Sequence, residues 1–191
     1  MNTMTLPDHL GGHENETHID DGAMTFMITK YGVKSYLDVG CGPGGMVELA
    51  LEKGLDALGI DGDFTLVRKL PNFVIHDYTT GPAPLPEGKL FDLGWSCEFL
   101  EHVEEKYSTN YMNTFSRCKR IIVTHALPGQ GGHHHVNEND VNYWFHKFGE
   151  FGFLLDLKTT NEVRQVSTMK QRYIRQNGLV FFNSNLNWQL V

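Results

Sequence analysis

The sequence predicts an α/β fold in which a mostly parallel sheet is covered by helices on both faces. Short apolar segments alternate with segments of helical periodicity along most of the chain, a pattern typical of parallel strands joined by crossover helices. A glycine-rich turn follows the first of these strands and opens a helix. The 191 residues, of which 40% are hydrophobic, are enough for one domain over residues 1–191.

The N-terminal part joins a polar segment to the first helix. Apolar residues recur at three- and four-residue spacing from Ile19 onward, which predicts a helix over residues 17–31. Two glycines, Gly11 and Gly12, give mobility to the chain before this helix. We therefore expect residues 1–30 to form a helical lid segment that folds over a bound ligand and excludes water.

The next elements alternate between strand and helix. An apolar run predicts a strand at Ser35–Val39, and helical spacing after the glycine-rich turn predicts a helix that ends at Gly54. Apolar runs predict strands at 57–60 and 73–76, with a helix over 64–70 between them. Three prolines make residues 81–88 a surface loop.

The remaining elements complete the alternation. Apolar runs predict strands at 91–95 and 121–125, separated by a helix over 106–118. Helical spacing through Val141, Trp144 and Phe148 predicts a helix over 140–151. Residues 153–158 and 179–182 have the pattern of a closing pair of strands.

Charge argues against nucleic acid as a partner. The formal net charge is −7, so the surface as a whole repels a phosphate backbone. The exception is a basic segment from Arg164 to Arg175, whose simpler interpretation is a solvated face of a late hairpin or helix.

Cysteine usage and hydropathy favour a cytoplasmic protein with no membrane contact. Cys41, Cys97 and Cys118 are odd in number and widely spaced, which fits neither a disulfide framework nor a zinc site. No stretch reaches the ~18 apolar residues that a membrane span needs, and the N-terminal residues lack the pattern of a signal peptide. The sequence does not indicate an oligomeric state.

The glycine-rich turn predicts a nucleotide-like ligand. Gly40, Gly42 and Gly45 satisfy the spacing G-x-G-x-x-G, and Asp61 ends the second strand, where a carboxylate can accept hydrogen bonds from ribose hydroxyls. A nicotinamide or flavin dinucleotide fits this pattern too. Asp38, however, suits an ammonium or sulfonium group better than a pyrophosphate, and Pro43 lacks an N–H that a phosphate could use.

Three segments together resemble the class I S-adenosylmethionine-dependent methyltransferases of the small-molecule branch. The segments run from Leu37 to Gly45, from Gly59 to Asp61 and from Phe91 to Val103. The resemblance implies a Rossmann-like three-layer sandwich with a mostly parallel seven-stranded sheet whose last strand is antiparallel. It also implies S-adenosylmethionine as cofactor and S-adenosylhomocysteine as product. Gly94 departs from the family pattern, which more often has a branched apolar residue there.

The resemblance also implies which residues bind the cofactor. Asp38, Gly40 and Gly42 would line the methionine moiety, Asp61 would hold the ribose with Gly62 and Asp63 beside it, and His76, Asp77 and Tyr78 would border the adenine. Cys41, Ser96 and Cys97 complete the expected set.

The methyl acceptor is expected beyond the carboxyl ends of the fourth and fifth strands, where open parallel sheets bind ligands. Candidate general bases are His102, His125, His133 and His134, because imidazole titrates near neutral pH. We interpret Glu98 and Glu101 as loop carboxylates rather than catalytic groups. No functional metal is expected, because neighbouring side chains of the histidine triplet His133 to His135 diverge and no H-x-x-x-H pair is present.

The sequence thus predicts methyl transfer from S-adenosylmethionine to oxygen or nitrogen of a small polar acceptor, a sugar or another metabolite. Two alternatives stay open: a methyltransferase acting on RNA or a modified base, and a non-catalytic module that binds S-adenosylmethionine. A nicotinamide oxidoreductase is disfavoured by Asp38 and Pro43.

Overall fold

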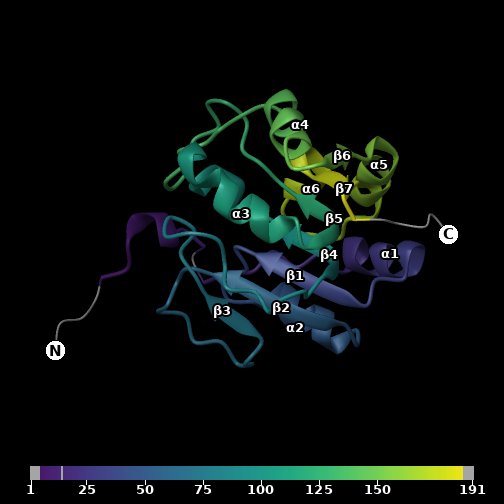
Figure 1. The fold of residues 1–191 in the computed structure, drawn as a ribbon, viewed down its shortest axis with the longest axis horizontal. Coiled ribbons are helices and arrows are strands. Elements are labelled where there is room, and N and C mark those ends of the chain that lie inside the picture. The colour runs from purple at the N-terminus through teal and green to yellow at the C-terminus, as the bar shows by residue number, and fades with distance from the viewer. Residues whose placement is uncertain (1–4, 14, 187–191) are drawn as a thin grey trace.

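Seven strands form one sheet in the order β3-β2-β1-β4-β5-β7-β6 in the computed structural model, which describes residues 5–13 and 15–186. Figure 1 shows them side by side, from β3 at the lower left to β6 at the upper right. Only β7 runs antiparallel to its neighbours, so the predicted seven-stranded, mostly parallel sheet with a reversed last strand is confirmed. The strands are β1 Ser35–Val39, β2 Asp56–Asp61, β3 Phe73–Ile75, β4 Phe91–Ser96, β5 Cys118–Val123, β6 Phe153–Leu155 and β7 Leu179–Asn183.

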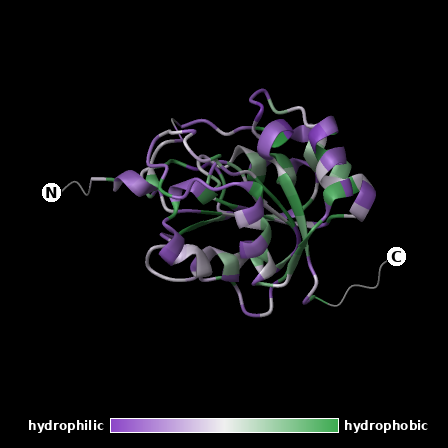
Figure 2. Cartoon of the chain, turned by 90° about the horizontal axis from the view of Figure 1, so that it is seen from above, coloured by the Kyte–Doolittle hydropathy of each residue, from purple (hydrophilic) through white to green (hydrophobic). Residues whose placement is uncertain are grey.

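Helices cover both faces of the sheet. One face packs against α1, α2, α5 and α6, with the fully buried Tyr36 and Trp95 projecting from β1 and β4. The opposite face packs against α3 and α4, and Leu37, Phe181 and Trp144 belong to its buried cluster. Figure 2 shows that hydrophobic residues concentrate on the strands inside and hydrophilic ones on the outer helices and loops. The helices are α1 Asp21–Tyr31, α2 Gly45–Glu52, α3 Ser108–Phe115, α4 Val141–Gly149, α5 Leu157–Val166 and α6 Tyr173–Asn177, with 3-10 turns η1 Asp8–Leu10, η2 Leu100–His102 and η3 Glu105–Tyr107.

The helix predicted over residues 64–70 is wrong. These residues form turns, bends and irregular chain. The carboxylate of Asp63 accepts hydrogen bonds from the backbone N–H and the hydroxyl of Thr65, at 2.7 and 2.6 Å, and so closes a local turn that competes with a helix. The segment has no apolar face to bury either, since Val67 is 95% exposed.

The strand predicted over residues 153–158 is correct only in its first half. It ends at Leu155, and α5 begins at Leu157 because the Asp156 carboxylate caps the backbone N–H of Thr159 at 2.9 Å. The N-terminal helix is also shorter than predicted. Asp20 caps it through the N–H of Ala23 at 3.0 Å, so residues 17–20 lie outside the helix.

The predicted lid segment, residues 1–30, includes residues 1–4 and 14, which lie outside the described residues. No helix in the described ranges is both long and apolar enough to cross a membrane.

Candidate functional site

The glycine-rich turn connects β1 to α2. Gly40 and Gly44 have φ angles of 75° and 94°, a left-handed conformation that side-chain-bearing residues rarely adopt. The ring of Phe99 lies directly on Gly40, because a Cβ atom there would be 2.5 Å from it. A substitution at Gly40 would therefore both strain the turn and displace Phe99.

Asp61 joins the end of β2 to this turn. Its carboxylate accepts hydrogen bonds from the backbone N–H groups of Gly42 and Asp63, each at 2.8 Å. Burial raises the pKa of Asp61, and these two hydrogen bonds act in the opposite direction. The arrangement fixes the carboxylate at the carboxyl end of the sheet, beside the glycine turn.

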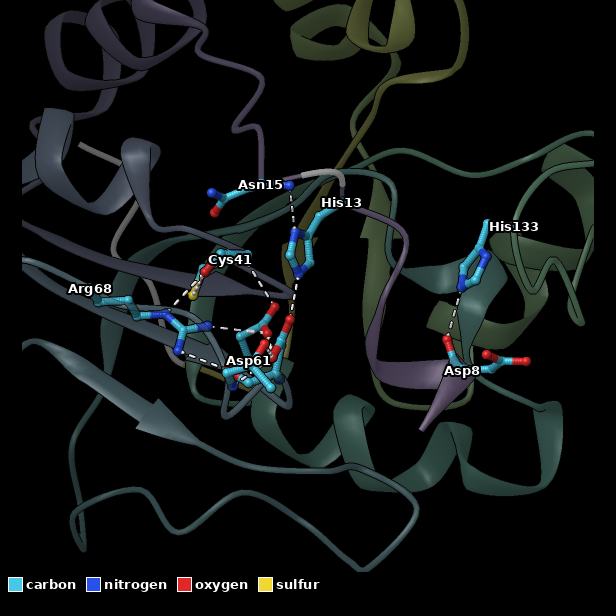
Figure 3. A network of polar contacts seen from close by, with 10 residues as sticks. Asp8, His13, Asn15, Cys41, Asp61, Arg68 and His133 are labelled. Carbon is cyan, nitrogen blue, oxygen red and sulfur yellow. Dashed lines mark hydrogen bonds and ion pairs between the residues drawn. The ribbon is translucent and has the colours of Figure 1, made fainter. Parts of the chain in front are cut away.

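Arg68 contacts both the glycine turn and the end of β2, a role that the sequence analysis did not predict. The guanidinium donates to the backbone oxygens of Gly42 and Asp63, at 3.0 and 3.1 Å, and its terminal nitrogen lies 3.2 Å from an Asp61 oxygen as an ion pair. Figure 3 shows Arg68 approaching Asp61 from one side and His13 from the other. A single arginine within an incorrectly predicted helix gave no sequence signal of this role.

A cavity of about 690 Å³ opens beside the glycine turn, at the carboxyl ends of the strands. It brings together twelve of the sixteen site residues that the sequence predicted. These are Gly40, Cys41, Gly42, Asp61, Gly62, His76, Asp77, Tyr78, Cys97, His102, His133 and His134.

The other four predicted residues, Asp38, Asp63, Ser96 and His125, do not line this cavity. Asp38 is buried, and its pKa lies well above the usual range because of that burial and the nearby charge of Asp61. The hydroxyl of Ser96 donates to the backbone oxygen of Val39 at 2.8 Å.

His125 departs furthest from its predicted role. Its Nδ1 lies 3.0 Å from the backbone oxygen of Asn139, and its ring packs beside Trp144. Because β5 ends at Val123, two residues earlier than predicted, His125 lies in the following loop and is buried away from the cavity.

The N-terminal residues 8–13 and 15–18, here called the N-terminal strap, cross the cavity. His9 and His13 contact the carboxylates of Asp77 and Asp63 at 3.0 and 2.8 Å. The Leu10 side chain packs over Gly62, where a Cβ atom would lie 2.3 Å from it. The strap therefore contacts the segments predicted to bind ribose and adenine. Sequence reasoning had considered a lid here but had not identified the two histidine contacts.

The histidine triplet contacts both the strap and the loop after β4. Nε2 of His133 lies 3.0 Å from the backbone oxygen of Asp8, a contact seen at the right of Figure 3. The His135 ring stands edge-on to His102 at 5.0 Å, and its Nδ1 lies 3.0 Å from Glu138. Burial lowers the pKa of His102 to about 4, with a further contribution from His135, so the His102 imidazole is neutral at pH 7.

In the part of the chain that the structure describes, no three His, Cys, Asp or Glu side chains are grouped closely enough to hold a metal ion.

Comparison with known proteins agrees with this geometry. Residues 37–124 match a family model described as a methyltransferase domain. No curated protein matches the chain.

Several solved structures share the fold at low sequence identity. Magnesium protoporphyrin IX methyltransferase from Synechocystis PCC 6803 with bound SAM is 20% identical, with a TM-score of 0.53, over 78% of this chain and 69% of that one. A TehB-like SAM-dependent methyltransferase from Corynebacterium glutamicum is 18% identical, with a TM-score of 0.58, over 85% and 86% of the two chains. Human N-acetylserotonin methyltransferase with SAM is 14% identical, with a TM-score of 0.56, over 85% and 50%.

Proposed function

Because residues 37–124 match a methyltransferase domain, we propose that this chain transfers a methyl group from S-adenosylmethionine to oxygen or nitrogen of a small polar acceptor, a sugar or another metabolite. The observation that carries the proposal is the single cavity that joins the glycine turn and Asp61 to the loop after β4 and the histidine triplet. Such a cavity has room for a cofactor at one end and a small acceptor at the other.

The residues present fit S-adenosylmethionine. A cavity of about 690 Å³ is within the usual range for small-molecule sites. A carboxylate has about four acceptor positions, so Asp61 can still accept from two ribose hydroxyls while it holds Gly42 and Asp63. The backbone of Gly40 and Gly42 would face the methionine moiety, and His76, Asp77 and Tyr78 would border the adenine.

For methyl transfer, the protein has to position the acceptor atom and remove its proton. The bound cofactor supplies an electrophilic methyl group on a sulfonium. The cavity walls would hold the acceptor atom in line with it, which is a large part of the acceleration available to such a displacement. The N-terminal strap would exclude water, and the imidazole of His102, His133 or His134 would accept the proton of a hydroxyl acceptor.

Two of the basic residues considered for nucleic-acid binding are used within the fold. Arg164 donates to the backbone oxygen of Gly178 at 2.8 Å, and Arg175 donates to those of Met169 and Gln171 at 2.5 and 3.0 Å. Because these guanidinium groups donate to backbone oxygens around α6, they have fewer N–H donors left for a phosphate backbone. This supports a small acceptor over RNA or a modified base.

Paired substitutions test the division of roles between the two ends of the cavity. Asp61→Ala should weaken S-adenosylhomocysteine binding at least tenfold, because the ribose loses its carboxylate partner. His134→Ala should lower turnover, measured as S-adenosylhomocysteine released with a panel of alcohol and amine metabolites, and should leave cofactor affinity within about twofold. Calorimetric titration measures both affinities.

The exposed His146 on α4 provides the control, and His146→Ala should change neither quantity. Equal loss of cofactor affinity in the Asp61 and His134 variants would refute the assignment of roles. A panel that yielded methylated products only from nucleic acids would refute the acceptor class.

A further inference from the structure

Glu98 stands next to the glycine turn. It is the second residue after the end of β4 at Ser96. Strand β4 pairs with β1, and the glycine turn follows β1. The neighbouring Phe99 packs its ring on Gly40, so the loop after β4 and the glycine turn are in direct contact. Glu98 also lines the cavity. Its carboxylate therefore faces the space between the cofactor-binding turn and the histidine triplet.

The backbone of Glu98 is held in a conformation that glutamate seldom adopts. Its φ angle is 52°, in the left-handed region. Thr124 fixes it twice: the Glu98 N–H donates to the Thr124 hydroxyl oxygen at 2.8 Å, and that hydroxyl donates to one carboxylate oxygen at 3.1 Å. The second carboxylate oxygen has no partner among the described residues. Strained residues that their surroundings fix in this way cluster at functional sites.

The carboxylates around Glu98 favour a cationic acceptor over an anionic one. No lysine or arginine is among the described residues that line the cavity, whereas Glu16, Asp61, Asp77 and Glu104 line it together with Glu98. A phosphate group placed beside Glu98 would meet imidazoles, such as that of His135, but no lysine or arginine from the described part of the chain. A nitrogen that gains positive charge during methyl transfer would instead be stabilised by the Glu98 carboxylate.

We propose that Glu98 binds the acceptor nitrogen at the point of methyl transfer, so that the acceptor is an amine. This inference rests on the proposed methyl transfer and narrows it to nitrogen. It replaces the interpretation of Glu98 as a loop carboxylate.

The transfer balances with Glu98 as the proton acceptor. The lone pair of the amine nitrogen forms the bond to the methyl carbon while the carbon–sulfur bond breaks, and its electron pair remains on sulfur. The proton that nitrogen loses passes to the free oxygen of Glu98. Burial raises the pKa of Glu98, which makes it a better proton acceptor than an exposed glutamate.

Sinefungin tests the proposal without a known acceptor. This cofactor analogue carries a primary ammonium group in place of the methyl-bearing sulfonium, so its ammonium projects to the point of methyl transfer. The affinities of sinefungin and S-adenosylhomocysteine are measured by calorimetry at pH 7.5. Wild-type protein should bind sinefungin at least tenfold more tightly than S-adenosylhomocysteine, and in Glu98→Gln that ratio should fall close to one with the affinity for S-adenosylhomocysteine unchanged.

Two further variants make the comparison decisive. Glu98→Gly removes the carboxylate and also suits the positive φ angle, so it should fold and lose the preference for sinefungin in the same way. Glu87→Gln removes one charge at an exposed position and should keep the wild-type ratio. A ratio retained in both Glu98 variants, or no preference in the wild type, would overturn the role of Glu98 alone. Failure of the wild type to bind either ligand would instead overturn the proposed function.

Discussion

At the scale of single residues, the most unusual group is Glu101, behind the cavity. Its side chain is 0% exposed, and neither carboxylate oxygen has a hydrogen-bond partner among the described residues. Burial raises its pKa to about 8, with a further contribution from the nearby Glu98. Glu101 is therefore largely protonated at neutral pH.

This protonation makes stability depend on pH. Between pH 4.5, the ordinary pKa of glutamate, and pH 8, the native protein holds a proton that the unfolded chain releases. The free energy of unfolding should therefore fall as pH rises through this window, by at most about 1.4 kcal/mol per pH unit from this residue. Glu101→Gln should flatten that slope and leave the protein more stable than the wild type at pH 8.

Urea unfolding at half-unit pH steps measures the slope. The exposed Glu87→Gln serves as the control and should keep the wild-type slope. If the free energy of unfolding of Glu101→Gln had the same pH dependence as that of the wild type, Glu101 would not be protonated in the native protein at neutral pH.

Many of the residues that we propose to bind the cofactor could be selected from sequence because they follow strand ends that apolar runs mark. Asp61, Cys97 and His76 are of this kind, and they line one cavity. Arg68 and His9 could not be predicted, because each contacts a partner far along the chain: Arg68 reaches Gly42, and His9 reaches Asp77. Nothing in local periodicity specifies such a contact.

At the scale of elements, the strands were predicted better than the helices. A buried parallel strand is a continuous apolar run, which is easily identified, whereas a helix boundary depends on one capping side chain. The start of α5, which was predicted as strand, shows this: β6 ends at Leu155, Asp156 caps the helix, and α5 begins at Leu157. The 3-10 turns and the short α6 bury few residues and left no periodic pattern.

The packing around Gly94 in β4 explains why this position departs from the family pattern. A Cβ atom at this position would lie 2.6 Å from the Ile121 side chain and 2.8 Å from the sulfur of Cys118 on β5. The neighbouring strand thus fills the space that a branched residue would occupy elsewhere. Glycine at this position is a packing requirement, not a weakness of the strand.

Gly94→Ala should accordingly destabilise the protein by about 1–3 kcal/mol, the usual cost of overpacking a filled core. Gly149→Ala is the matched control, because no atom lies within 4 Å of a Cβ atom there. It should be neutral or slightly stabilising, as expected for alanine at a helical position. Chemical denaturation measures both, and a Gly94→Ala variant as stable as the wild type would show that Ile121 and Cys118 move aside freely.

At the scale of the whole molecule, the topology places the functional groups. The parallel strands β1, β2, β3 and β4 end on the same edge, so segments far apart in sequence meet there. The N-terminal strap and the histidine triplet close the cavity from the other side. The sheet could be predicted from alternation alone, but this closure could not, because it depends on contacts between loops.

The most direct test of the cofactor assignment is thermal unfolding of the protein alone and with S-adenosylmethionine, S-adenosylhomocysteine, NAD or NADP. A ligand at 100 times its dissociation constant stabilises the native state by about 2.7 kcal/mol, which shifts the midpoint of a domain of this size by several degrees. The account predicts that only the two adenosyl ligands raise the midpoint. A shift with NAD or NADP alone would contradict it, because the glycine turn and Asp61 would then serve a dinucleotide.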